Sequence, residues 1–403
     1  MILCEALNDQ IKEGINQMAD FMKALVYNEA PDIFEQIDFD NDKAFLEPFL
    51  FTYFNNQDKK YPLESILNGY LKEKSETPLQ VLPNKEGIAY IPQIGYFKPV
   101  KENKVNPNVP DELPLLLSNG IELLTHQHSL VEERFEVNVI IVNQPINTLT
   151  KEQIEEFGKA VDGVTEVEIT QTTKYHYNHL QKAFDIIEEH LSALHEEILL
   201  SNRRIVLFHN RTVLCFVTIQ VHGTSFITTI PENDEIFFIE EIIHQCSHNT
   251  FNSLFFNKDD YFKIDVENTI LGTLIGKEDR EIRTVYSVLH GLCTVAKRFE
   301  AFHILYKKNI FSGKQKHEFL GRFADLRKRS KLGLELLNHS SVFTAKGLEI
   351  YNLLDQTCTD ICNATKELEG IFNFSNQPSE FSYKKFCELN PLSKFEHTEL
   401  FIN

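Results

Sequence analysis

Two histidines stand four residues apart in a segment, residues 235–255, that is expected to be helical. Positions i and i+4 lie on one face of an α-helix, so His244 and His248 can reach the same metal ion. The HExxH motif of metallopeptidases has this spacing, and its second residue is a glutamate that acts as general base. Here that residue is Gln245, and an amide cannot take a proton from a metal-bound water. The pair therefore predicts a metal site whose chemistry differs from that of the HExxH peptidases.

A third histidine, His290, lies within a second expected helix over residues 278–308 and is followed by Gly291, which permits close approach of a backbone or ligand. Arg283 stands seven residues earlier, which places it on the same helical face about 10 Å away, with Ser287 between the two. A guanidinium suits a two-pronged grip on a carboxylate. The segment predicts a metal ligand beside a carboxylate-binding arginine, although a core histidine and a solvated arginine are the ordinary structural interpretations.

The order of these segments resembles the HEXXH-motif peptide-modification proteins of bacterial ribosomal-peptide clusters. That family is regarded as iron(II)- and 2-oxoglutarate-dependent peptide β-hydroxylases. The resemblance covers roughly residues 200–310. It rests on Phe226-Ile-Thr-Thr-Ile-Pro, Ile242-Ile-His-Gln-Cys-Ser-His-Asn, Asn252-Ser-Leu and Arg283-Thr-Val-Tyr-Ser-Val-Leu-His-Gly.

The resemblance implies an oxygenase that hydroxylates a β-carbon in a ribosomally made precursor peptide. It implies that His244, His248 and His290 bind Fe(II). It also implies that Arg283 pairs with a carboxylate of 2-oxoglutarate. Ser287, which lies between Arg283 and His290, is expected in the same cofactor site because of that position. Two features depart from the family: Gln245 replaces the motif glutamate, and the usual Pro-Trp and Arg-Pro are absent because Thr follows the arginine and the chain has no Trp.

The residue types leave other assignments open. Non-haem iron sites commonly include a carboxylate ligand, and the nearby candidates are Asp259, Asp260, Asp265 and Asp279. Three histidines with an open position equally suit zinc. A zinc-dependent hydrolase, with Glu240, Glu241 or another carboxylate as base, is therefore the second hypothesis. A non-catalytic peptide-binding relative, in which Gln245 reflects lost chemistry, is the third.

Composition narrows the partners. The 403 residues include 40 Lys and Arg against 59 Asp and Glu, a net charge of −19. Affinity for phosphate backbones and anionic membranes comes from clustered cations, so neither nucleic acid nor a membrane surface is expected as a partner. No apolar run approaches the ~20 residues that span a bilayer, and the start lacks the pattern of a signal peptide. The seven scattered cysteines are typical of the reduced cytoplasm, which is the expected location.

The surrounding elements must position these side chains. We predict a mostly helical α+β fold in which a small antiparallel β meander packs with long helices. Helices are expected over residues 5–27, 43–54, 63–74, 113–124, 147–162, 175–200, 235–255, 278–308, 314–337 and 343–369. Strands are expected over residues 87–95, 136–142, 204–208, 212–220 and 226–230, the last three forming the meander. A change of character near residue 200 divides the chain into an N-terminal region, 1–200, expected to recognise the substrate, and a metal-binding catalytic-like domain, 201–403.

Overall fold

The computed structural model describes residues 1–56, 59, 61–73, 77–99, 102–126, 167–210, 213–277, 281–378, 380–395 and 398. This part of the chain is mostly helical with small β-sheets, which confirms the predicted α+β class. None of its helices is both long and apolar enough to cross a membrane. The strand expected at 136–142, the helix expected at 147–162 and Asp279 lie outside the described residues.

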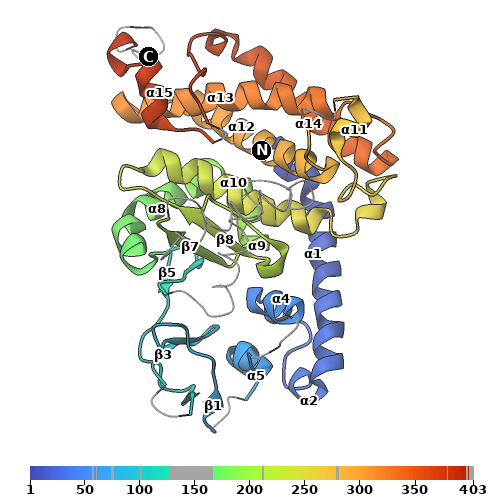
Figure 1. Cartoon of the computed structure of the whole chain (residues 1–403), viewed down its shortest axis with the longest axis vertical. Coiled ribbons are helices and arrows are strands. Elements are labelled where there is room, and N and C mark those ends of the chain that lie inside the picture. Colours follow the sequence, from blue (N-terminus) through green and yellow to red (C-terminus); the bar gives the residue numbers. More distant parts are fainter. Residues whose placement is uncertain are drawn as a thin grey trace, which may run out of the picture.

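Figure 1 shows three tiers of structure, with the long helix α1 running beside the lower two. The helices are α1 (Ile2–Glu29), α2 (Pro31–Phe34), α3 (Asp42–Phe45), α4 (Pro48–Asn55), α5 (Leu63–Leu67), α8 (Thr170–His190), α9 (Ser192–Ser201), α10 (Glu235–Leu254), α11 (Leu271–Ile275), α12 (Val285–Lys308), α13 (Gly313–Leu337), α14 (Ala345–Ala364) and α15 (Tyr383–Leu389). The strands are β1 (Leu79–Gln80), β2 (Ala89–Ile91), β3 (Gly95–Phe97), β4 (Lys104–Val105), β5 (Leu115–Leu116), β6 (Glu122–Leu123), β7 (Arg204–Phe208) and β8 (Thr224–Thr228).

The main sheet has the strand order β5-β6-β7-β8, in which β5 and β6 are antiparallel whereas β6, β7 and β8 run parallel. The prediction of an antiparallel meander is therefore wrong in its topology. The expected middle strand, residues 212–220, forms no strand in its described part, where Phe216 makes a single bridge to Phe226. The connection between β7 and β8, residues 209–223, is thus a long crossover, which parallel neighbours require.

Several expected helices also differ from the structure. The segments 43–54 and 175–200 each divide into two helices, α3 with α4 and α8 with α9, and the helix expected over 63–74 ends at Tyr70. The segment 113–124 is the β5–β6 hairpin rather than a helix, because Asn119 and Gly120 form its turn and Gly120 has a positive φ of 86°. The helix expected from residue 278 begins at Val285, because the side chain of Thr284 accepts a hydrogen bond from the backbone N–H of Ser287 and caps the helix there.

Helix α10 occupies the centre of the molecule. Its N-terminus is capped by Asp234, whose side chain accepts a hydrogen bond from the backbone N–H of Ile236. It packs against α1, α8, α9, α12 and β8, so most of its side chains are buried on every face. A helix buried all round belongs to the core, and each polar group on it needs a partner or a function.

The core and the main sheet both extend across position 200. Strand β6, from the N-terminal region, pairs with β7 from the C-terminal region, and one hydrophobic cluster includes residues from Leu3 to Phe395. The seven cysteines are free thiols, six of them buried, which matches their use as small apolar side chains. The assignment of residues 1–200 to substrate recognition stays a prediction.

A buried ionic network connects the start of helix α4 with strands β6 and β7 of the main sheet. Arg204 in β7 donates through Nη1 and Nη2 to Glu47, with 2.9 Å for the Nη2 contact, and through Nε to Glu122 at 2.8 Å. Tyr70 and Tyr90 donate to the same two carboxylates. Arg204, Glu47 and Glu122 are 0%, 1% and 6% exposed, so the charges depend on one another for compensation.

We expect Arg204→Met to lower the free energy of unfolding by about 3–5 kcal/mol, because it leaves two buried carboxylates without their cation. Urea denaturation measures the change. Lys331→Met is the control, since it breaks an exposed pair with Glu369 at 2.9 Å and should cost less than about 1 kcal/mol. An equal loss of unfolding free energy in the two variants would contradict a stabilising role for the buried network.

Candidate metal centre

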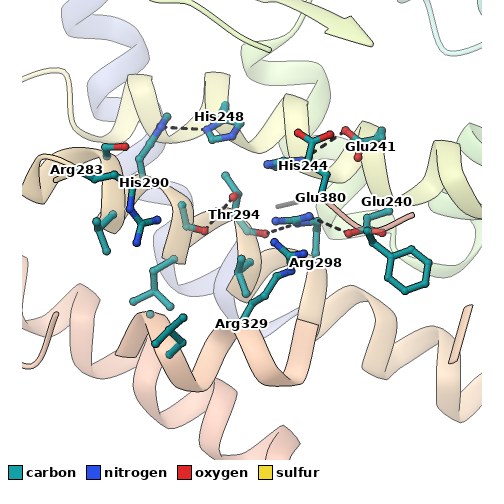
Figure 2. Close-up of a pocket in the computed structure, with 18 of the residues that line it drawn as sticks. Glu240, Glu241, His244, His248, Arg283, His290, Thr294, Arg298, Arg329 and Glu380 are labelled. Carbon is teal, nitrogen blue, oxygen red and sulfur yellow. Dashed lines mark hydrogen bonds and ion pairs between the residues drawn. The ribbon is translucent and has the colours of Figure 1, made fainter. Parts of the chain in front are cut away.

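The structure brings the three predicted histidines together where α10 crosses α12. His244 and His248 extend from one face of α10, and His290 approaches from α12 (Figure 2). The ring centroids of His244 and His248 are 4.9 Å apart, and those of His248 and His290 are 4.6 Å apart. His248 Nδ1 lies 3.0 Å from His290 Nδ1. The imidazole rings of His244, His248 and His290 thus lie in one row.

These rings border a cavity of about 490 Å³ between α10, α12, α13 and the segment that precedes α15. Arg283 and Ser287 also line it, as the sequence analysis required of a cofactor site. Its other polar lining residues are Glu240, Glu241, Thr294, Arg298, Arg322, Arg329 and Glu380. The cavity therefore joins imidazoles, guanidinium groups and carboxyl groups in a single space.

The donors fit a divalent transition metal in kind. Neighbouring ligands of an octahedral ion, each bound at about 2.1 Å, are about 3 Å apart, and the Nδ1 atoms of His248 and His290 have that separation. Burial lowers the pKa of His290 to about 4 and that of His248 far below its usual value, so both rings are neutral, as metal ligands must be. The buried His290 Nε2 makes no hydrogen bond within the described chain.

The third ring is held differently. His244 Nδ1 lies 3.5 Å from Glu241 Oε2 and 3.2 Å from Gln245 Nε2. Across the described residues, no group of three or more His, Cys, Asp or Glu side chains is arranged as a ready metal site. His248 and His290 converge, whereas Nδ1 of His244 belongs to a hydrogen-bonded group beside them. Figure 2 shows the other nitrogen of His244 directed away from Glu241.

Arg283 reaches the cavity by a different route from the predicted one. It precedes α12, whose first residue is Val285, so the expected placement on one helical face with His290 is wrong. Its Nε and Nη2 donate to the two carboxylate oxygens of Glu281, with 2.8 Å for the Nε contact and 2.5 Å for the other. The side chain is 51% exposed, which places it at the rim of the cavity.

Arg298 is a cavity cation that the sequence analysis missed. His290, Thr294 and Arg298 follow one another at four-residue intervals, so they form a stripe along α12 that points into the cavity (Figure 2). Arg298 Nε donates to the Thr294 carbonyl at 3.3 Å, and Nη1 donates to Glu240 at 2.8 Å. Its positive charge helps to lower the pKa of His244 and His248, after burial as the main cause. The sequence signal for Arg298 is its spacing, because residues four and eight positions after His290 lie on the same face of a helix.

Carboxyl groups near the histidines come from α10 and the C-terminal segment. Burial opposes ionisation of Glu241, but hydrogen bonds and charge from His244, Gln245 and Arg298 lower its pKa to about 2. Burial and the charge of Glu241 raise the pKa of Glu380 to about 8. A charged and a neutral carboxyl group thus share the inner end of the cavity. Glu241 stands three residues before His244, a spacing from which the contact is readable.

The aspartates proposed as alternative ligands do not line the cavity in the described part of the chain. Asp265 accepts hydrogen bonds from the backbone N–H groups of Glu267 and Asn268 in its own turn. Asp260 faces Lys346 at 3.8 Å. Neither is directed toward the histidines, so histidine remains the donor type of this site.

No protein-family profile matches the sequence, and comparison with curated proteins finds no matching relative. The resemblance to the peptide β-hydroxylases therefore rests on the motifs and their spacing.

The buried histidines make the stability of chelator-treated protein depend on pH. His290 has a pKa of about 4 when folded and about 6.5 when unfolded. The unfolded chain therefore binds more protons between these values, so this stability is fully present above pH 6.5 and is lost as the pH falls toward 4. We expect denaturant titrations to show a loss of up to about 3 kcal/mol from His290 alone.

His290→Gln should reduce the slope of this pH dependence, because the amide does not titrate, although other buried histidines such as His176 and His222 also have a lowered pKa and retain part of the dependence. The half-buried His339 provides the control, and His339→Gln should retain the wild-type slope. A slope unchanged by His290→Gln would contradict a buried, neutral imidazole at this position.

Proposed function

We propose that the protein is an iron(II)- and 2-oxoglutarate-dependent oxygenase that hydroxylates a β-carbon of a ribosomally made peptide. The observation that carries the proposal is the convergence of His248 and His290 beside His244 on a cavity that also contains guanidinium groups. A three-histidine set would leave the charge of Fe(II) uncompensated, and an anionic dicarboxylate cosubstrate would offset it.

Each part of the cavity has a role in this proposal. His244, His248 and His290 would hold iron, which would supply the activation of dioxygen. Arg283 and Ser287, which are predicted to bind 2-oxoglutarate, line the cavity. Arg298 lines it as well. The apolar side chains of α12 and α13 that complete the lining would exclude water from the reacting groups.

The substrate and location follow the chemistry of the chain. A net charge of −19 favours a basic peptide, or a basic leader attached to the modified segment, over an acidic one. The free cysteines suit a reducing compartment, so we propose that the protein acts on its precursor peptide in the cytoplasm.

A zinc hydrolase is the second candidate, because Glu241 lies in the cavity next to His244. The low pKa of about 2 for Glu241, despite its burial, makes it a weak base for activating water. Glu240 is engaged by Arg298 and Arg322 through its two carboxylate oxygens. Both carboxylates are therefore better suited to holding other side chains than to abstracting protons.

Protein loaded with Fe(II) under anaerobic conditions should convert 2-oxoglutarate to succinate once oxygen is admitted, and succinate can be quantified by mass spectrometry. His248→Ala should lower turnover by more than about 100-fold, because mutation of a residue that merely hydrogen-bonds to a metal ligand already lowers metal affinity or activity about 10–100-fold. His179→Ala, on α8 outside the cavity, is the matched control. Absence of iron binding and of turnover by the wild-type protein would refute the proposal, and peptide hydrolysis with zinc would favour the alternative.

Conservative variants of the two arginines should differ in their effect on 2-oxoglutarate. If the guanidinium of Arg298 binds a carboxylate of 2-oxoglutarate, Arg298→Lys should raise the KM for 2-oxoglutarate about 10–100-fold, because an ammonium group cannot make the bidentate, charge-assisted contact, which is worth about 1.5–3 kcal/mol. Arg283→Lys should change it less, since that guanidinium is half exposed at the rim of the cavity, where water weakens an ionic contact. A larger effect at Arg283 would instead support the carboxylate site implied by the family resemblance.

A further inference from the structure

Gln245 stands where the HExxH motif carries its catalytic glutamate, yet its side chain is only 1% exposed. It is absent from the described residues that line the cavity. Its Nε2 donates to Glu241 Oε2 at 3.0 Å and lies 3.2 Å from His244 Nδ1. Gln245 therefore faces the carboxylate and the imidazole of its own helix rather than the space where a substrate would bind.

The contacts of His244 allow two tautomers with opposite consequences. If Nδ1 carries the proton, it donates to the Glu241 carboxylate, and Nε2 is left with a lone pair for a metal. If Nδ1 accepts from Gln245, Nε2 carries the proton and cannot bind a metal. An ionised carboxylate only accepts hydrogen bonds, so Glu241 favours the first tautomer. In that tautomer Gln245 Nε2 and His244 Nδ1 are both donors, and both donate to Glu241 rather than to each other.

We propose that Gln245 and Glu241 are positioning residues that hold His244 as a metal ligand. Gln245 donates to Glu241 and keeps its carboxylate against the imidazole, and Glu241 accepts from Nδ1–H and directs Nε2 to the metal. The metal-binding role of this relay rests on the proposed function. In this relay Gln245, at the position of the motif glutamate, supports a metal ligand and does not activate water.

The arrangement also explains why an amide occupies this position. Glu241 already lies among the buried carboxyl groups of Glu240 and Glu380, which act on one another electrostatically. A glutamate at 245 would add a further acceptor against Glu241 where the structure has a donor. Buried like charges at such a distance are unfavourable, so an amide fits this position where a second carboxylate would not.

Cobalt(II) affinity and the tautomer of His244 test the relay. Glu241→Met should weaken cobalt(II) binding about 10–100-fold, and Gln245→Met and Gln245→Glu should each weaken it about 10-fold. In metal-free protein labelled with 15N-histidine, the wild-type spectrum should show His244 protonated at Nδ1, and Glu241→Met should move the proton to Nε2. His244→Ala identifies the signal.

Ser247→Ala is the control, because its buried hydroxyl lies on the same helix and makes no hydrogen bond within the described chain. It should retain the wild-type affinity and tautomer. Thermal unfolding of each variant, together with the signals of His248 and His290, separates loss of the relay from loss of folding. A Gln245→Glu variant that binds metal more tightly, or that hydrolyses peptides with zinc, would overturn the inference.

The two readouts separate the relay from the proposed function. If cobalt(II) binds the wild-type protein but the affinity and tautomer are unchanged in Glu241→Met and Gln245→Met, the relay is wrong and the oxygenase proposal stands. If the wild-type protein binds no metal but His244 changes its tautomer in Glu241→Met, the positioning contact is correct and the proposed function is wrong.

Discussion

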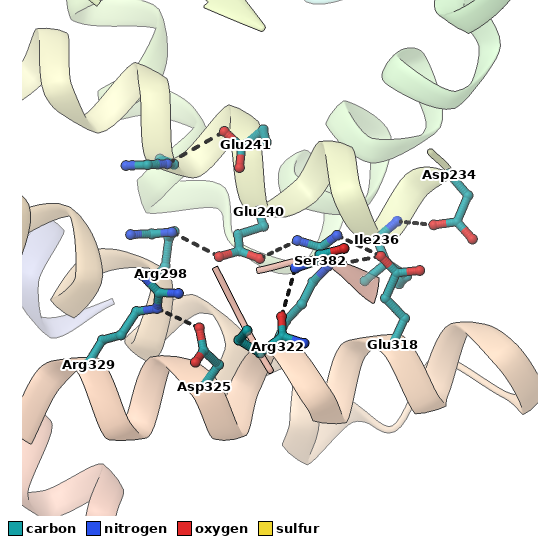
Figure 3. Close-up of polar contacts among 12 residues, drawn as sticks. Asp234, Ile236, Glu240, Glu241, Arg298, Glu318, Arg322, Asp325, Arg329 and Ser382 are labelled. Atoms are coloured by element: carbon teal, nitrogen blue, oxygen red, sulfur yellow. Dashed lines mark hydrogen bonds and ion pairs between the residues drawn. The ribbon is translucent and has the colours of Figure 1, made fainter. Parts of the chain in front are cut away.

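Glu240 is a buried carboxylate on α10 that accepts hydrogen bonds from Arg298 of α12 at 2.8 Å and from Arg322 of α13 at 2.7 Å (Figure 3). Burial alone would raise its pKa, but the two guanidinium groups lower the pKa below its usual value. Loss of one partner from such a group leaves an uncompensated charge in the core, which costs several kcal/mol. Two of the histidines lie on α10 and the third on α12, so their meeting depends on the packing of these two helices, which this buried link stabilises.

The same link explains how an acidic protein can keep cations inside a cavity. The chain has a net charge of −19, and an anionic cosubstrate would approach against that charge. Arg298 is held at the cavity by Glu240 across the interface of α12 with α10, whereas Arg322 and Arg329 are held by Glu318 and Asp325, each one turn earlier on α13 (Figure 3). Each arginine is thus oriented by a carboxylate instead of extending into solvent. The cavity therefore presents positive groups to an anion although the protein as a whole is negatively charged.

Much of this centre follows from local spacing in the sequence. Helix periodicity predicts that His244 and His248 share one face of a helix. The grouping of His290 with them is implied by the family resemblance and not by its own surroundings. The boundaries of β7 and α10 are equally local. The approach of α12 to α10 is tertiary. Local spacing places Arg298 on the face of His290, but that this face and Glu380 border one cavity depends on which elements pack together.

The errors have physical causes too. Arg283 seemed to share a face with His290 because an unbroken helix was assumed, whereas the hydroxyl of Thr284 starts the helix only after it. The segment 113–124 has enough leucine for a helix, yet its Asn-Gly turn makes a hairpin. The parallel pairing of β7 with β8 depends on a crossover whose path local propensity does not determine.

The most direct test is an anaerobic crystal structure of the protein with Fe(II) and 2-oxoglutarate, with the metal located by its anomalous signal. We expect one iron bound by nitrogen atoms of His244, His248 and His290, with His244 Nδ1 still against Glu241 and 2-oxoglutarate in the same cavity. Iron bound elsewhere, or a cavity in which the three histidines keep only their contacts with one another at saturating metal, would contradict it.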